Sequence, residues 1–208
     1  MDRGLWITWY DLPEDRRETY LSWLHMNYIP QMLKRPGFLW GCHYSEVEKI
    51  PGSGAAAHTD DPAVPTGKRY ILLFGAENAD AFGDPLPSEI MAALPEADKK
   101  MLAIRKGARE NIMTEYGRVE GPAAKAYKEG MTLAPCIQLG TYNTDWQNEE
   151  ELLAYYKQAR LKHMSVLPGA SGRANWIPSR AGRSTACSTS LPRWTCAISI
   201  SPGTGMPE

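Results

Sequence analysis

Hydrophobic and polar positions near the start of the chain follow two periodicities, first that of a strand and then that of a helix. Residues 5–10 form a short apolar run that predicts a strand, with Trp6, Thr8 and Tyr10 on one face and Leu5, Ile7 and Trp9 on the other. The acidic pair Glu14 and Asp15 comes next, which favours the beginning of a helix. Apolar residues then recur at spacings of three and four: Leu21, Leu24, Tyr28 and Met32, with His25 and Ile29 beside them. Pro36-Gly37 should end this helix.

The next segments predict two strands and a second helical region. Residues 38–44 read as a strand with Phe38, Trp40, Cys42 and Tyr44 on one side, and residues 69–76 read as a buried strand. The Gly/Pro/Ala-rich stretch 50–68 between them has no periodicity and is predicted to be a loop insert. The pattern from 87 to about 116 is helical, interrupted at Pro95. The order predicts a ferredoxin-like βαββαβ unit of the α+β class.

A shift of 132 residues aligns the chain with itself. Tyr10 meets Tyr142, Met32 meets Met164, and Pro36-Gly37 meets Pro168-Gly169. We therefore expect tandem ferredoxin-like repeats, with the first repeat at 1–132 and the start of an incomplete second repeat at 133–168.

The character of the chain changes at Gly169. Ser, Thr, Arg, Pro and Gly dominate residues 169–208, so an irregular tail is expected there. Two explanations stay open for this composition: a disordered tail, and a stretch translated in a shifted reading frame.

Charge and composition narrow the class of protein. The chain has 208 residues, is 43% hydrophobic and carries a formal net charge of -1. No basic stripe for nucleic acid, no signal-peptide core and no membrane-spanning run is found, so we expect a cytoplasmic globular protein without nucleic-acid or membrane partners. Its four cysteines form no CxxC pair, and no nucleotide-binding motif is found. We therefore expect neither a cofactor nor a metal site.

A string of motifs resembles a known superfamily. Residues 23–30 read Trp-Leu-His-Met-Asn-Tyr-Ile-Pro, Pro36-Gly37 follows, and His43-Tyr44 ends the second strand. This combination resembles the EthD-like members of the dimeric α/β-barrel superfamily. The superfamily's frequent histidine directly before Val/Ile-Pro is replaced here by Tyr28, and by Arg160 at the shifted position. The resemblance implies a homodimer or an internally closed barrel around a small molecule. It also implies isomerase, cyclase, decarboxylase or cofactor-free monooxygenase activity, or none.

Aromatic and imidazole side chains gather in the first repeat and define the candidate site. His25 is the candidate base, with Tyr28 and Tyr10 orienting an oxygen of the substrate. The candidate substrate-binding residues are Trp6, Trp23, Trp40, His43, Tyr44, Tyr142 and Arg160. The predicted function is a small-molecule enzyme acting on an aromatic or polyketide-like compound by proton transfer, isomerisation, cyclisation or cofactor-free oxygenation. The alternative is a noncatalytic ligand-binding or oligomer-forming barrel of a catabolic pathway.

Overall fold

The computed structural model describes residues 2–46, 66–122, 136–144, 146–166, 172–178 and 193–201. The predicted loop insert 50–68 falls mostly outside this range, and so does Asp145.

The first part of the chain forms the predicted βαββαβ order. Its elements are β1 (Gly4–Asp11), η1 (Glu14–Arg16), α1 (Arg17–Trp23), the π-helical turn η2 (Leu24–Tyr28), α2 (Ile29–Met32), β2 (Phe38–Ser45), β3 (Tyr70–Ala76), η3 (Ala79–Phe82), α3 (Pro87–Ala92), α4 (Glu96–Leu102) and β4 (Lys106–Glu120). Helix α1, η2 and α2 run without a break, and their buried residues Tyr20, Leu24, Tyr28 and Met32 recur every four positions.

The second part of the chain adds β5 (Cys136–Thr144), α5 (Trp146–Tyr155), the π-helical turn η5 (Tyr156–Arg160), α6 (Leu161–Val166), β6 (Gly172–Pro178) and β7 (Arg193–Ser201). Strands β6 and β7 lie within the segment that we expected to be irregular. The average composition of that segment hides short runs such as 193–201, where Trp, Thr, Cys and Ile are suited to a strand.

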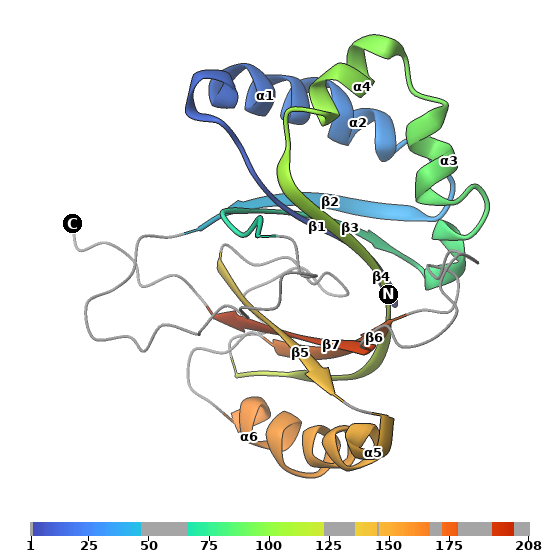
Figure 1. Ribbon diagram of the computed structural model, residues 1–208. Coiled ribbons are helices and arrows are strands. Elements are labelled where there is room, and N and C mark those ends of the chain that lie inside the picture. Colours follow the sequence, from blue (N-terminus) through green and yellow to red (C-terminus); the bar gives the residue numbers. More distant parts are fainter. Residues whose placement is uncertain are drawn as a thin grey trace.

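All seven strands belong to one antiparallel sheet in the order β2-β3-β1-β4-β6-β7-β5. The long strand β4 joins the two parts: residues 106–114 pair with β1, and residues 113–120 pair with β6, with a shift in register between Glu115 and Gly117. In Figure 1, α1 to α4 lie above β1, β2 and β3, and α5 and α6 lie below β5, β6 and β7, so the strands stand between two layers of helices.

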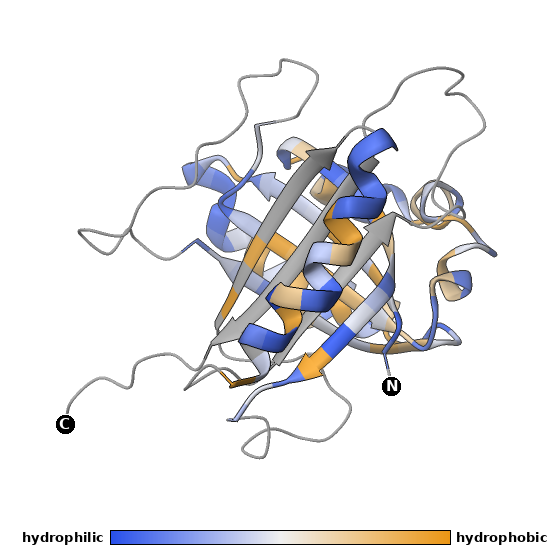
Figure 2. Cartoon of the chain, turned by 90° about the horizontal axis from the view of Figure 1, so that it is seen from below, coloured by the Kyte–Doolittle hydropathy of each residue, from blue (hydrophilic) through white to orange (hydrophobic). Residues whose placement is uncertain are grey.

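The two faces of the first strands bury different sets of side chains. The face toward α1 to α4 carries an aromatic-rich core that includes Trp6, Tyr10, Tyr28, Tyr70 and Phe74. The opposite face buries Leu5, Ile7, Trp9, Trp40, Leu73 and Met113, and Ile137 and Leu139 of β5 pack against them. This confirms the predicted alternation along β1. Figure 2 shows the molecule from the side of α5 and α6, where hydrophilic and hydrophobic segments alternate along the helices.

Two local expectations differ from the structure. The helical region ends at Leu102, and residues 106–120 form a strand whose neighbours Ile112 and Met113 enter opposite cores. Strand β2 shifts register between Phe38 and Trp40, so Phe38 joins the helix-side core while Trp40 faces the other way. Such an irregularity changes which face a side chain takes, and simple alternation does not predict it.

Units 4–76 and 136–201, called here the first and second units, share one plan. Each runs strand, helix, π-helical turn, helix, strand, strand, and their strands order as β2-β3-β1 and β6-β7-β5. The π-helical turn at Leu24–Tyr28 recurs at Tyr156–Arg160, a shift of 132 residues (156 minus 24). Residues 132 positions apart thus lie in corresponding elements from the first strand to the second strand of each unit.

Candidate functional site

A chain of hydrogen bonds crosses the helix-side face of the first unit. His25 Nε2 lies 3.1 Å from His43 Nδ1, and the Nε2 of His43 lies 2.8 Å from the hydroxyl of Tyr10. His25 is exposed, His43 is half-buried and Tyr10 is fully buried. The chain therefore connects the protein surface to its core through three groups that can each gain or release a proton.

Three elements bring these residues together. Strands β1 and β2 flank β3, where Tyr10 pairs with Tyr70 and His43 pairs with Leu72. The ring of Tyr70 stacks on both Tyr10, at 5.7 Å between centroids, and His43, at 5.5 Å. His25 comes from the π-helical turn η2. Such turns insert an extra residue into a helix and are frequent at functional sites.

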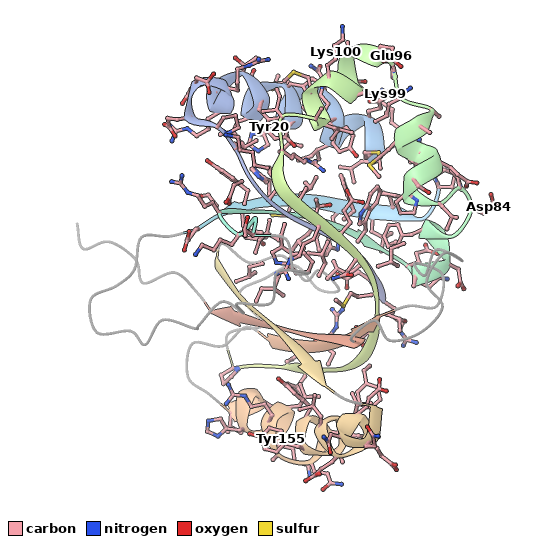
Figure 3. The ribbon with its side chains drawn as sticks, viewed as in Figure 1. Tyr20, Asp84, Glu96, Lys99, Lys100 and Tyr155 are labelled. Atoms are coloured by element: carbon pink, nitrogen blue, oxygen red, sulfur yellow. The ribbon has the colours of Figure 1, made fainter. Side chains whose placement is uncertain are left out.

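Arg105, just before β4, adds a buried cation to the same site. Its side chain is 5% exposed, and its Nε donates to the hydroxyl of Tyr20 at 2.6 Å. Its guanidinium lies over the Tyr10 ring, 4.7 Å from the centroid, and 5.9 Å from the rings of Tyr20 and Tyr28. Nη1 lies 3.7 Å from a carboxylate oxygen of Glu110. In Figure 3, Tyr20 lies between α1 and the chain that leads into β4.

The backbone beside Arg105 makes this position possible. Gly107 has a φ of 54°, in the left-handed region where residues with a side chain are strained. Its carbonyl accepts a hydrogen bond from the Gly67 N–H at 3.0 Å. The hydrogen bond between Gly67 and Gly107 fixes the beginning of β4, where Lys106 pairs with Asp11 at the end of β1. Arg105 directly precedes this position.

Burial sets the protonation states within the site. Burial, together with nearby His25 and Arg105, lowers the pKa of His43 to about 3, so this imidazole is neutral at neutral pH. Burial also raises the pKa values of the Tyr10 and Tyr28 hydroxyls well above the ordinary value, and Arg105 opposes that rise in both. Burial raises the pKa of Glu110, against the opposing effect of Arg105. Both tyrosines therefore keep their protons at neutral pH.

These protonation states define how the chain can carry a proton. When the Tyr10 hydroxyl donates to His43 Nε2, neutral His43 carries its proton on Nδ1 and donates it to His25 Nε2. His25 then accepts through Nε2, and its other nitrogen carries the proton. In the opposite order, His25 donates from Nε2 to His43 Nδ1, His43 donates from Nε2 to the Tyr10 oxygen, and Nδ1 of His25 is free to accept a proton. The direction of these hydrogen bonds therefore decides whether an exposed nitrogen of His25 can accept a proton.

The structure brings together six of the residues predicted from the sequence. His25, Tyr28, Tyr10 and His43 lie on the helix-side face, and Trp6 and Trp23 belong to the same core. The Trp23 indole lies 5.1 Å from the Tyr28 ring and donates to Asp98 Oδ1 at 2.8 Å.

Four predicted site residues lie elsewhere. Trp40 and Tyr44 belong to the opposite face of the sheet, where the Trp40 indole donates to Asp2 Oδ2 at 2.9 Å. Tyr142 pairs with Thr195 in the second unit, and Arg160 ends η5 as an exposed residue. Tyr155, labelled on the lower helical layer in Figure 3, marks how far η5 lies from Tyr20 and α1. These positions separate the four residues from the chain of hydrogen bonds.

Sequence reasoning missed Arg105, Glu110, Tyr20 and Tyr70. Arg105 and Glu110 fall in the stretch 87–116 that was expected to be helical, and no role was predicted for them. Only a correct strand boundary at Lys106 would have placed Glu110 beside Ile112 on the helix side. Within the described part of the chain, no three His, Cys, Asp or Glu side chains come together as a metal site. None of the described helices combines the length and apolar character needed to cross a membrane.

Comparison with known proteins identifies the fold. No protein-family model matches the chain, and no curated protein matches it. A structure named anthrone oxidase-like protein superimposes with a TM-score of 0.61 at 10% identity, covering 98% of this chain and 74% of its own. A "putative monooxygenase" from Lactobacillus acidophilus gives a TM-score of 0.52 at 12% identity, covering 97% and 78%. Another from Fusobacterium nucleatum gives 0.51 at 12%, covering 96% and 76%. At such identities the likeness shows the fold alone, which is α+β and ferredoxin-like.

Proposed function

We propose that this chain is a small-molecule enzyme that removes a proton from an aromatic or polyketide-like compound, with His25 as the base. The observation that carries the proposal is the hydrogen-bonded series His25, His43 and Tyr10, which begins at the surface and ends in the core. A base needs contact with both its substrate and a path for the proton. Exposed His25 is open to a substrate, and when its Nε2–H donates to neutral His43, its Nδ1 is free to accept the substrate's proton.

The aromatic surroundings support a flat substrate. Tyr28 and Trp23 lie beside one another on the helix that carries His25, and the Tyr28 hydroxyl keeps its proton. A protonated phenol can donate to a carbonyl or phenolate oxygen, while the rings contribute dispersion and apolar area. Tyr10 and Tyr28 would therefore orient an oxygen of the substrate.

We assign the reaction to cofactor-free oxygenation, in line with the names of the structural neighbours. For anthrone, His25 removes a proton from the methylene carbon, and the resulting carbanion transfers electrons to molecular oxygen. A carbon–oxygen bond forms and gives a peroxide at that carbon. Loss of water from the peroxide leaves anthraquinone, so one anthrone and one O₂ yield one anthraquinone and one water. The substrate is oxidised, oxygen is reduced, and the proton held by His25 returns in the water.

Anthrone is the direct probe of this proposal. The chain should consume oxygen and form anthraquinone, measured with an oxygen electrode and by absorbance, faster than a buffer control. His25→Ala should return the rate toward the control value while circular dichroism stays unchanged. If anthrone and related phenols bind without turnover, the chain is a ligand-binding barrel. If the folded protein neither binds nor converts them, the proposal fails.

We also propose that the two units arose by tandem duplication within an EthD-like ancestor. The strand pairings support this: Gly4 pairs with Ala76 in β1/β3, and Cys136 pairs with Ser201 at the matching end of β5/β7. Sequencing the encoding DNA tests the related hypothesis of a shifted reading frame in 169–208. An early stop or no strand-like sequence in the shifted frame would reject it.

A further inference from the structure

The guanidinium of Arg105 has one nitrogen without a partner among the described residues. Nε donates to Tyr20, and Nη1 faces Glu110 at 3.7 Å, but Nη2 is buried and makes no hydrogen bond. A buried donor on a charged group is costly to leave unpaired, more so than a neutral one. This is the kind of exception that calls for an explanation such as a bound group.

The surroundings of Nη2 suit an aromatic guest. Three tyrosine rings, from Tyr10, Tyr20 and Tyr28, surround the guanidinium at 4.7 to 5.9 Å from its central carbon. They offer apolar ring surface next to a fixed positive charge. Arginine binds carboxylates and other planar oxyanions through its fork of N–H donors, and burial strengthens such hydrogen bonds.

We propose that Arg105 Nη2 binds an anionic oxygen attached to the aromatic ring system of the substrate. The inference rests on the proposed function and adds the substrate class: an aromatic compound with a carboxylate, phenolate or enolate oxygen. Tyr10 connects Arg105 to the hydrogen-bonded series, because its ring lies under the Arg105 guanidinium while its hydroxyl forms a hydrogen bond with His43. Negative charge that develops on the oxygen during proton removal would then lie beside a fixed cation.

Glu110 is the charged group that faces Arg105 from β4, and neutral His43 lies beyond Tyr10. An incoming anion would lie close to the Glu110 carboxylate and favour its protonated form. Binding of an anionic ligand should therefore be accompanied by proton uptake. Calorimetric titration in buffers of different ionisation enthalpy measures that uptake together with the affinity.

The test compares naphthoate with naphthamide substituted at the same ring position, by calorimetry without turnover. The two probes have the same shape, and only naphthoate carries an anionic oxygen. The wild-type chain should bind naphthoate at least about tenfold more tightly, because the arginine contact is charge-assisted. Arg105→Gln should abolish this preference, and Arg105→Lys should keep part of it by retaining the charge. Arg109→Gln is the matched control, since Arg109 lies over Trp9, 4.4 Å from its ring, and not among the three tyrosines.

The outcomes separate this inference from the proposed function. Equal affinity of the wild-type chain for both probes overturns the anion site, and this needs no variant to fold. A preference that survives in folded Arg105→Gln overturns the role of Arg105. Preference for naphthoate without any oxidation of anthrone supports the anion site and rejects the proposed oxygenation. Oxidation of anthrone without a preference for naphthoate supports the oxygenation and rejects the anion site.

Discussion

The first and second units share a scaffold but not its chemistry. Both contain a π-helical turn at the same 132-residue shift, and both order their strands in the same way. His25 of the first unit corresponds to Lys157, Tyr28 to Arg160 and His43 to Asn175, while Tyr10 corresponds to Tyr142. The hydrogen-bonded series thus has no sequence equivalent in the second unit. The comparison teaches that one arrangement of strands and helices can carry different side chains at corresponding positions.

Arg105 is a second difference between the two units. It follows α4 and enters the first unit from outside the segment that the two units share. The site therefore needs a residue that the shared plan does not supply. Within the described residues, the second unit has no element that corresponds to α4.

The largest expected effect is on turnover. His25→Ala should lower the rate of anthrone oxidation about 100- to 10,000-fold, the usual contribution of a general base. Lys157→Ala, at the shifted position, should leave the rate within about twofold, because the second unit has no His at the positions that correspond to His25 and His43. Initial rates of both variants under air measure the difference. Equal losses in the two variants would contradict a site confined to the first unit.

The next effect concerns stability and the opposite face of the sheet. Trp40→Ala should lower the free energy of unfolding by about 3–5 kcal/mol, because a buried indole and its hydrogen bond to Asp2 are lost. Urea unfolding followed by circular dichroism measures this. Leu39→Ala is the control: Leu39 is 41% exposed, and a change within about 0.5 kcal/mol is expected. A loss below 1 kcal/mol for Trp40→Ala would mean that this face is not a packed core.

A smaller effect comes from the titration of His43. Its pKa is about 3 in the folded chain and about 6.5 when unfolded, so the unfolded state binds more protons below pH 6.5. Stability should fall as the pH drops below 6.5, by about 2 kcal/mol at pH 5 from this group alone. His43→Gln should remove that share of the pH dependence. Unfolding curves of both proteins at pH 7 and pH 5 check this. Equal losses of stability in the wild type and His43→Gln between these pH values would show that His43 is not kept neutral.

The smallest effect is expected at Tyr10, the buried end of the hydrogen-bonded series. Tyr10→Phe removes the hydroxyl that bonds His43 and keeps the ring under Arg105, so stability should fall by about 1 kcal/mol. The preference for naphthoate should remain. If Tyr10→Phe abolishes that preference as Arg105→Gln does, the hydroxyl itself belongs to the anion site.

Several parts of the fold and the site were predictable because they depend on local pattern. Alternation along β1 correctly separated Trp6 and Tyr10 from Leu5 and Ile7, and the spacing of apolar residues located the helix that carries His25. The same reasoning failed at β4, because residues 106–116 were predicted to be helical and form a strand instead. It also placed Phe38 on the wrong face, because the register shift in β2 is a property of the pairing with β3.

The sequence by itself determined the ferredoxin-like order of elements and the supply of aromatic and imidazole side chains in the first unit. Periodicity suffices for this because apolar residues must share one face if they are to leave water together. Only the tertiary structure decided that His25, His43 and Tyr10 form one hydrogen-bonded series and that Arg105 is buried above Tyr10. Contacts between residues 33 or 95 positions apart depend on strand register and on long-range packing, which no local pattern encodes.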